Sequence, residues 1–175
     1  VEQSRQVASV MADKSRKAMD LAMELLQGYD EAKAEQVAQM ETDVDRFEDE
    51  LGTYLVKLSS RQLSGKDSET LNTILHCIGD FERISDHARN VKEAAQEMYD
   101  KKLDFSDKAQ EELKVFERAV HDILDITMNS FIKGDLNLAR QVEPMEEVID
   151  GLSLDVKQRH VRRLRKGKCT IELGF

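Results

Sequence analysis

The scarcity of helix-breaking residues limits most strongly what this chain can fold into. Its 175 residues include one proline and eight glycines, and long stretches with apolar residues every three or four positions are separated by a few short breaks. This period is typical of helices, whereas strands alternate apolar and polar residues. The sequence therefore predicts an all-α protein, folded as an antiparallel up-down helical bundle.

Five helices are expected from this periodicity. They cover residues 4–27, 31–60, 68–99, 107–133 and 135–166. Asp30 is expected to cap the second helix, Asp67 or Ser68 the third, and Gly134 to close the fourth. Pro144 falls inside the fifth range, and a proline in a helix interior costs about 3 kcal/mol. We therefore expect a kink or a fresh helix start at Pro144.

The two halves of the chain match each other weakly at an offset of 105 positions. Matched pairs include Asp30 with Asp135, Ala34 with Ala139, Val37 with Val142, and Met40 with Met145. The matches share one helix phase, which predicts a duplicated three-helix unit: residues 1–100, and residues 101–175 without the last helix. The apolar seam left in the second unit would be closed most simply by a second copy, so a homodimer is expected; the alternative is that the tail, residues 169–175, folds back over the seam.

Net charge and cysteine content limit the classes of binding partner and the cellular compartment that fit this chain. Lys and Arg total 26 against 35 Asp and Glu, a formal charge of −9, so nucleic acid is not expected as a partner. No apolar run approaches the roughly 20 residues that span a bilayer. Cys77 and Cys169 have no disulfide or metal-site spacing, which fits a reducing compartment.

Acidic residues recur in pairs one helical turn apart. The pairs are Glu41 and Asp45, Glu82 and Asp86, and Glu146 and Asp150. Two such pairs on facing helices would bring four carboxylates together, an all-oxygen site suited to hard or borderline cations. One residue in five is acidic, with 35 of 175, so the same pairs are also expected on a solvated face that exchanges partners with Lys and Arg.

Three segments carry a resemblance to a known family. Residues 78–91 (Ile-Gly-Asp-Phe-Glu-Arg-Ile-Ser-Asp-His-Ala-Arg-Asn-Val) resemble the signature of the PhoU family, and residues 40–48 look like its other acidic motif. Residues 163–169, with Gly174-Phe175 at the end, are similar to the PhoU-like cytosolic tail of bacterial sodium/phosphate cotransporters. The resemblance therefore implies two three-helix bundles that hold metal ions on carboxylate-lined faces.

The same resemblance implies a ligand set for each bundle. Glu41, Asp45, Glu82 and Asp86 would hold the metal in the first bundle, and Glu146 and Asp150 would form half a site in the second. The ion would be iron, manganese, zinc or magnesium.

The function that follows is a regulatory or accessory cytosolic domain of a sodium-dependent phosphate transporter, and not an enzyme. Its partner would be the transporter's own membrane domain, which would precede Val1 and place the chain at the cytoplasmic face of the membrane. No nucleophile–base arrangement, phosphate-cradling glycine loop or zinc pattern is evident. The alternatives are a free-standing cytoplasmic PhoU-like regulator of phosphate uptake and, less favoured because Glu-x-x-His is absent, a carboxylate di-iron enzyme.

A basic stretch lies near the end of the chain. Residues 157–168 contain seven Lys or Arg and no acid. Such a stretch complements the dipole at a helix C-terminus and an acidic bundle. The functional alternative is contact with anionic lipid beneath a membrane domain.

Overall fold

The computed structural model describes residues 1–170, which contain helices and no strand, so the all-α prediction is confirmed. The chain divides into two compact units, residues 1–96 and residues 97–175. Gly174 and Phe175, at the end of the second predicted repeat, lie outside the described residues. No helix in the described part is both long and apolar enough to cross a membrane.

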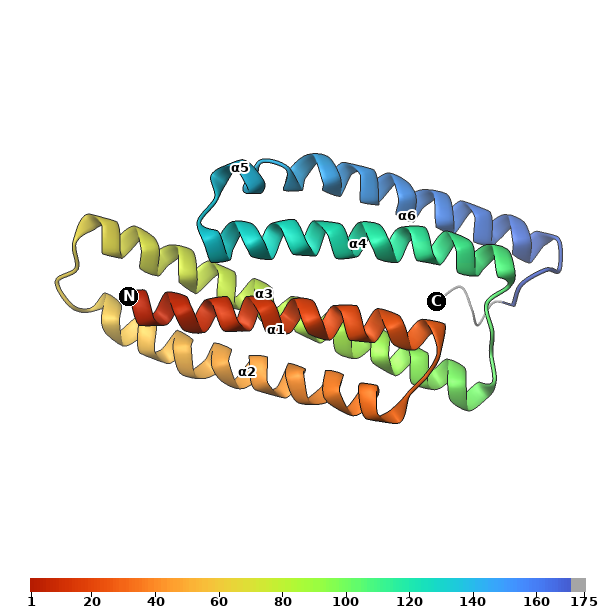
Figure 1. Ribbon diagram of the computed structural model, residues 1–175, viewed down its shortest axis with the longest axis horizontal. Coiled ribbons are helices and arrows are strands. Elements are labelled where there is room, and N and C mark those ends of the chain that lie inside the picture. Colours follow the sequence, from red (N-terminus) through yellow and green to blue (C-terminus); the bar gives the residue numbers. More distant parts are fainter. Residues whose placement is uncertain (171–175) are drawn as a thin grey trace. The chain divides into compact units, whose positions relative to one another are not determined.

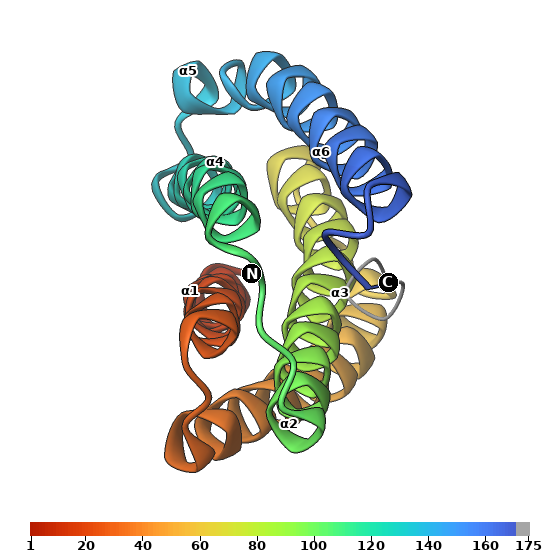
Figure 2. The ribbon, with the colours of Figure 1, turned by 90° about the vertical axis from the view of Figure 1, so that its right-hand side faces the viewer.

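Unit 1 contains three long antiparallel helices that run up, down and up (Figures 1 and 2). They are α1 (Glu2–Gln27), α2 (Glu31–Ser59) and α3 (Gly65–Lys101), and the last residues of α3 continue into unit 2. Each helix buries one apolar stripe. The buried side chains include Met11, Ala18 and Leu25 on α1, Val37, Val44 and Leu55 on α2, and Leu71, Ile78 and Phe81 on α3. The acidic side chains of α2 and α3 therefore lie beside a packed core rather than within it.

Two caps set where the helices of unit 1 begin. The Asp30 carboxylate accepts the backbone N–H of Lys33, as predicted. The third helix begins earlier than predicted, because Ser64 Oγ accepts the backbone N–H of Asp67 at 3.1 Å and donates to Asp67 Oδ2 at 2.7 Å. Ser64 is therefore the N-cap of α3, so the prediction of Asp67 or Ser68 as the cap was wrong.

Unit 2 is built on two antiparallel helices joined by a short one. They are α4 (Asp107–Lys133), α5 (Leu136–Ala139) and α6 (Val142–Arg165). The single helix predicted over 135–166 is interrupted at residues 140–141, between α5 and α6. Asp135 caps the start of α5 by accepting the N–H groups of Asn137 and Leu138. Pro144 is the third residue of α6, a first-turn position where its missing N–H breaks no helical hydrogen bond. The expected fresh helix start near Pro144 is confirmed.

Three helices end on a residue in the left-handed conformation. Gly134 and Gly167 have φ 64°, and Lys102 has φ 53°. At each end the N–H of the left-handed residue and that of the next residue donate to carbonyls of the last turn, the Schellman pattern. The predicted closing of the fourth helix at Gly134 is confirmed, whereas Lys102 carries a Cβ where glycine is favoured.

The apolar residues of unit 2 are more exposed than those of unit 1. Among the described residues of unit 2, Met128 is the single buried hydrophobic side chain. The exposed large ones are Tyr99, Val115, Ile132, Leu136, Val148, Leu154 and Val161. The duplication and the homodimer expected from the sequence stay predictions.

Candidate functional site

The first candidate site lies along one edge of the contact between α2 and α3. The two helices contact each other at two places. Arg89 of α3 binds Glu41 of α2, and Gly52 of α2 packs against Ile78 of α3 so closely that an added Cβ would lie 3.7 Å from Ile78 Cδ1. Buried Ser85 and Ala88 turn one face of α3 into the core. Glu82 and Asp86 lie beside that buried face and are partly exposed.

Glu82 is the centre of the negative charge at this edge. Burial, and then the charges of Asp86, Glu48 and Asp45, raise the pKa of Glu82 above its ordinary value, and a side-chain hydrogen bond with Asp86 acts in the same direction. Burial removes water from the carboxylate, and each neighbouring carboxylate disfavours another negative charge. Four carboxylates from two helices are thus within electrostatic range of one another.

Arg89 supplies the positive charge of this cluster. Its Nη1 lies 2.5 Å from Glu41 Oε1, and its Nη2 lies 3.2 Å from Asp86 Oδ1. The Glu41 side chain is only 14% exposed, so this ion pair is partly desolvated. Among the predicted first-bundle ligands, Glu41 is bound by Arg89. Glu48, which was not among the predicted ligands, lies near enough to Glu82 to raise its pKa. Glu48 continues the stripe of Glu41 and Asp45 along α2, and this spacing is the signal that points to it.

The cluster has the donor chemistry of a cation site but not a gathered ligand set. Within residues 1–170, no group of three or more His, Cys, Asp or Glu side chains is positioned to hold a metal ion. Glu146 and Asp150 are exposed on α6, one turn apart. Metal ligation by the six predicted carboxylates therefore stays a prediction.

A different acidic residue of α2 has a structural role. Asp43 Oδ2 lies 2.5 Å from Lys14 Nζ on α1, and its other oxygen accepts from Gln39. The hydrogen bond from Lys14 is the main cause that lowers the pKa of Asp43. Acidic residues of α2 thus differ by face: Asp43 joins α2 to α1, and the stripe with Asp45 and Glu48 meets α3.

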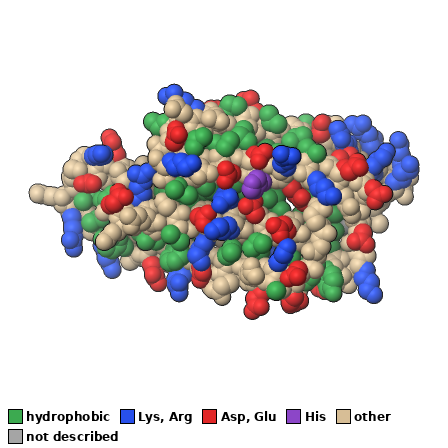
Figure 3. Space-filling model, in the orientation of Figure 1, with side chains coloured by type: hydrophobic (Ala, Val, Ile, Leu, Met, Phe, Trp, Pro, Cys, Tyr) green, Lys and Arg blue, Asp and Glu red, His purple; other side chains and the backbone are tan. Residues whose placement is uncertain are grey.

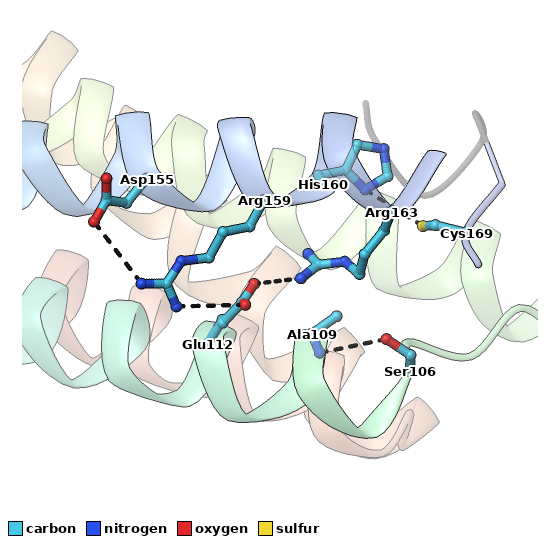
Figure 4. Close-up of polar contacts among 8 residues, drawn as sticks. All are labelled: Ser106, Ala109, Glu112, Asp155, Arg159, His160, Arg163 and Cys169. Carbon is cyan, nitrogen blue, oxygen red and sulfur yellow. Dashed lines mark hydrogen bonds and ion pairs between the residues drawn. The ribbon is translucent and has the colours of Figure 1, made fainter. Parts of the chain in front are cut away.

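The basic stretch of α6 is partly paired within unit 2. Arg163 Nη1 lies 2.7 Å from Glu112 Oε2 on α4, and both side chains are about 15% exposed, at 15% and 16%. Arg159 reaches the same carboxylate at 3.5 Å and Asp155 at 3.9 Å (Figure 4). Lys and Arg side chains gather at the right-hand end of Figure 3, where Figure 1 places the end of α6. Part of the positive charge thus holds α6 to α4.

A cysteine and a histidine that the sequence presents as isolated residues meet at the end of α6. Cys169 Sγ lies 3.3 Å from His160 Nδ1 (Figure 4). The contact depends on Gly167, because its left-handed turn ends α6 and reverses the chain. In the sequence, Gly167 after a run of basic residues indicates a helix end. It does not indicate that Cys169 folds back to contact His160.

Comparison with known proteins adds family evidence. The PhoU domain family matches residues 8–95. A curated protein of Thermotoga maritima, the phosphate-specific transport system accessory protein PhoU homolog 1, is 24% identical over 155 residues. That alignment covers 88% of this chain and 66% of the relative, so the chain spans slightly less than two thirds of the relative's length. No solved structure matches the chain significantly.

Proposed function

The chain belongs to the PhoU family, and from this premise we propose that it is a regulatory or accessory component of phosphate transport. The observation that carries the proposal is the family match over residues 8–95, which spans both acidic faces of α2 and α3. The relative from Thermotoga maritima is named as an accessory protein of phosphate-specific transport. The proposed role is control of a transporter rather than catalysis.

In the finer form of this proposal, the chain is the cytosolic domain of a sodium/phosphate cotransporter. Support comes from the similarity of residues 163–169 to the tail of such proteins and from the basic residues of α6, which suit a position beneath anionic lipid. The second candidate is a free-standing regulator of phosphate uptake. The name of the Thermotoga maritima relative favours that reading.

Phosphate uptake by cells separates these two forms. The complete reading frame is expressed in cells that lack their own uptake systems, and radiolabelled phosphate is followed with sodium or with choline in the medium. A cotransporter domain predicts sodium-dependent uptake from this reading frame alone. A free-standing regulator predicts no uptake by itself but a changed rate when a phosphate transporter is co-expressed. No effect in either setting would contradict a role in phosphate transport.

We further propose that the regulatory input is a cation held between α2 and α3. Glu82, Asp86, Asp45 and Glu48 would hold it, because their oxygens are the donors that hard cations prefer and their mutual repulsion would fall on binding. Arg89 already neutralises part of this charge through Glu41 and Asp86. The cation would therefore compete with the guanidinium for Asp86.

Thermal unfolding with added metal tests this input. Binding to the folded chain alone stabilises it by RT ln(1 + [L]/Kd), so Mn²⁺, Fe²⁺, Zn²⁺ or Mg²⁺ should raise Tm. The Glu82→Gln/Asp86→Asn variant should lose that rise. Glu93→Gln/Glu97→Gln is the matched control, because it removes two exposed carboxylates at the same spacing on the same helix. An equal rise in both variants would contradict the site, while leaving the proposed transport role to the uptake experiment.

A further inference from the structure

The contact between Cys169 and His160 pairs a nucleophile with a base. The thiol sulfur lies 3.3 Å from Nδ1 of the imidazole and 3.6 Å from the carbonyl oxygen of Thr170. The second imidazole nitrogen, Nε2, is enclosed and has no hydrogen-bond partner in the described part of the chain. A thiol beside an imidazole can pass its proton to the ring, and the resulting thiolate is the reactive form of cysteine.

A cavity of about 270 Å³ adjoins this pair. Its apolar wall is formed by Phe105, Leu113, Val156 and Val161. This volume lies just below the range of about 300–1,000 Å³ for small-molecule sites, so the cavity suits part of a small molecule rather than a macromolecule.

The polar side chains that line the cavity are basic or uncharged. Lys157, His160 and Arg163 contribute from α6, Ser106 is the polar group at the start of α4, and no acidic side chain is among the lining residues. Arg163 is occupied by Glu112 at 2.7 Å. Lys157 is thus placed to attract an anionic group.

We propose that Cys169 is a site of reversible S-thiolation by an acidic low-molecular-weight disulfide, with His160 as the base that activates the thiol. The Cys169 thiolate attacks one sulfur of the disulfide, and a new sulfur–sulfur bond forms as the old one breaks. The leaving thiolate takes the proton from the His160 imidazolium. The cysteine is oxidised and the departing half of the disulfide is reduced, so no other oxidant is needed.

The other cysteine provides an internal comparison. Burial is the main cause that raises the pKa of the Cys77 thiol, and the negative charge of Asp80 adds to it. Cys77 is therefore in an environment that disfavours the thiolate. Cys169 instead contacts the His160 imidazole and lines the same cavity as Lys157.

The test uses the reduced chain and glutathione disulfide as the acidic probe, with cystamine as a cationic probe. Peptide mass spectrometry after an acid quench gives the rate of adduct formation at each cysteine. Cys169 should react with glutathione disulfide about tenfold faster than Cys77, or more. His160→Gln should lower the Cys169 rate by about tenfold. Dithiothreitol should reverse the adduct.

A second set of variants tests the role of charge in the cavity. Lys157→Gln should lower the rate with glutathione disulfide and leave or raise the rate with cystamine. Lys168→Gln is the matched control, since Lys168 belongs to the same basic stretch but does not line the cavity. Helix content by circular dichroism, and equal thiol reactivity of all variants in denaturant, separate a lost site from a lost fold.

Three results would overturn the proposal. They are a Cys77 rate equal to that of Cys169, an unchanged Cys169 rate in His160→Gln, and equal effects of Lys157→Gln on the two probes. The last result would reject the acidic disulfide as the reaction partner of Cys169, and with it the proposal.

Discussion

Arg89 on α3 reaches Glu41 on α2, with 2.5 Å between Nη1 and Oε1. This ion pair places a fixed positive charge beside the carboxylates around Glu82. Pairs of this kind, with one side chain about half-exposed, contribute up to about 1 kcal/mol. The pair joins two helices, so it supports the fold as well as the charge balance of the site.

The first prediction concerns removal of that charge. Arg89→Gln should lower the metal-free stability by up to about 1 kcal/mol, because the ion pair is lost, and should enlarge the rise in Tm on metal addition, because the competing guanidinium is gone. Thermal unfolding with and without Mn²⁺ measures both effects. Arg83→Gln is the control, since Arg83 is exposed and reaches Asp80 only at 3.9 Å. A smaller metal effect in Arg89→Gln would show that the arginine supports the site instead of competing for it.

The second prediction concerns pH. Because the folded-state pKa of Glu82 is raised above its ordinary value of 4.5, its ionisation weakens the fold above the folded pKa, and this penalty disappears as pH falls below the unfolded value. Glu82→Gln should therefore be more stable than wild type near pH 7, by up to about 1 kcal/mol, and equal to it near pH 4. Urea unfolding across that range measures the difference. A benefit that grows as pH falls would contradict the direction of the shift.

The third prediction concerns the end of α3. Lys102 adopts φ 53°, where a side chain costs about 1 kcal/mol relative to glycine. Lys102→Gly should raise the free energy of unfolding by about that amount. Lys102→Ala removes the charge but keeps the Cβ, and should bring no comparable gain. Equal stability of the two variants would mean that the charge, and not the backbone, sets the cost.

The fourth prediction concerns the two arginines that share Glu112. Arg163 is 15% exposed and Arg159 is 52% exposed, so desolvation strengthens the first pair more. Double-mutant cycles with Arg163→Met, Arg159→Met and Glu112→Gln should give a coupling of about 1–2 kcal/mol for Arg163 and below about 0.5 kcal/mol for Arg159. The reverse order would contradict the geometry at 2.7 and 3.5 Å.

Much of the fold can be predicted from local residues. The helical period predicts the long helices, and Asp30 and Gly134 mark ends because their roles depend on backbone groups within a few positions. The start of α3 was missed although Ser64 and Asp67 have the spacing of a capping box. The break between α5 and α6 was predicted in part. Pro144 correctly signals a new helix start nearby, but no residue of the sequence indicated that α5 ends at Ala139.

The sites depend on contacts that sequence spacing does not determine. Spacing places Glu82 and Asp86 on one face, but the rotation of α2 against α3 decides that Glu48 approaches Glu82 and that Arg89 takes Glu41. Cys169 and His160 are nine positions apart, and the chain reversal at Gly167 decides that they meet. The contacts within each site therefore depend on how the helices pack and how the chain turns, which residue spacing alone does not determine.

The guanidinium of Arg89 also bears on how the protein behaves when no cation is bound. A carboxylate cluster without a resident counter-charge would push its helices apart, and the chain would then depend on its ion for folding, as zinc fingers do. At the proposed cation site, the counter-charge of Arg89 would let loading and unloading proceed on a folded bundle. Occupancy of such a site follows the concentration of the free ion, which is the property that a reversible reporter requires and a purely structural metal site lacks.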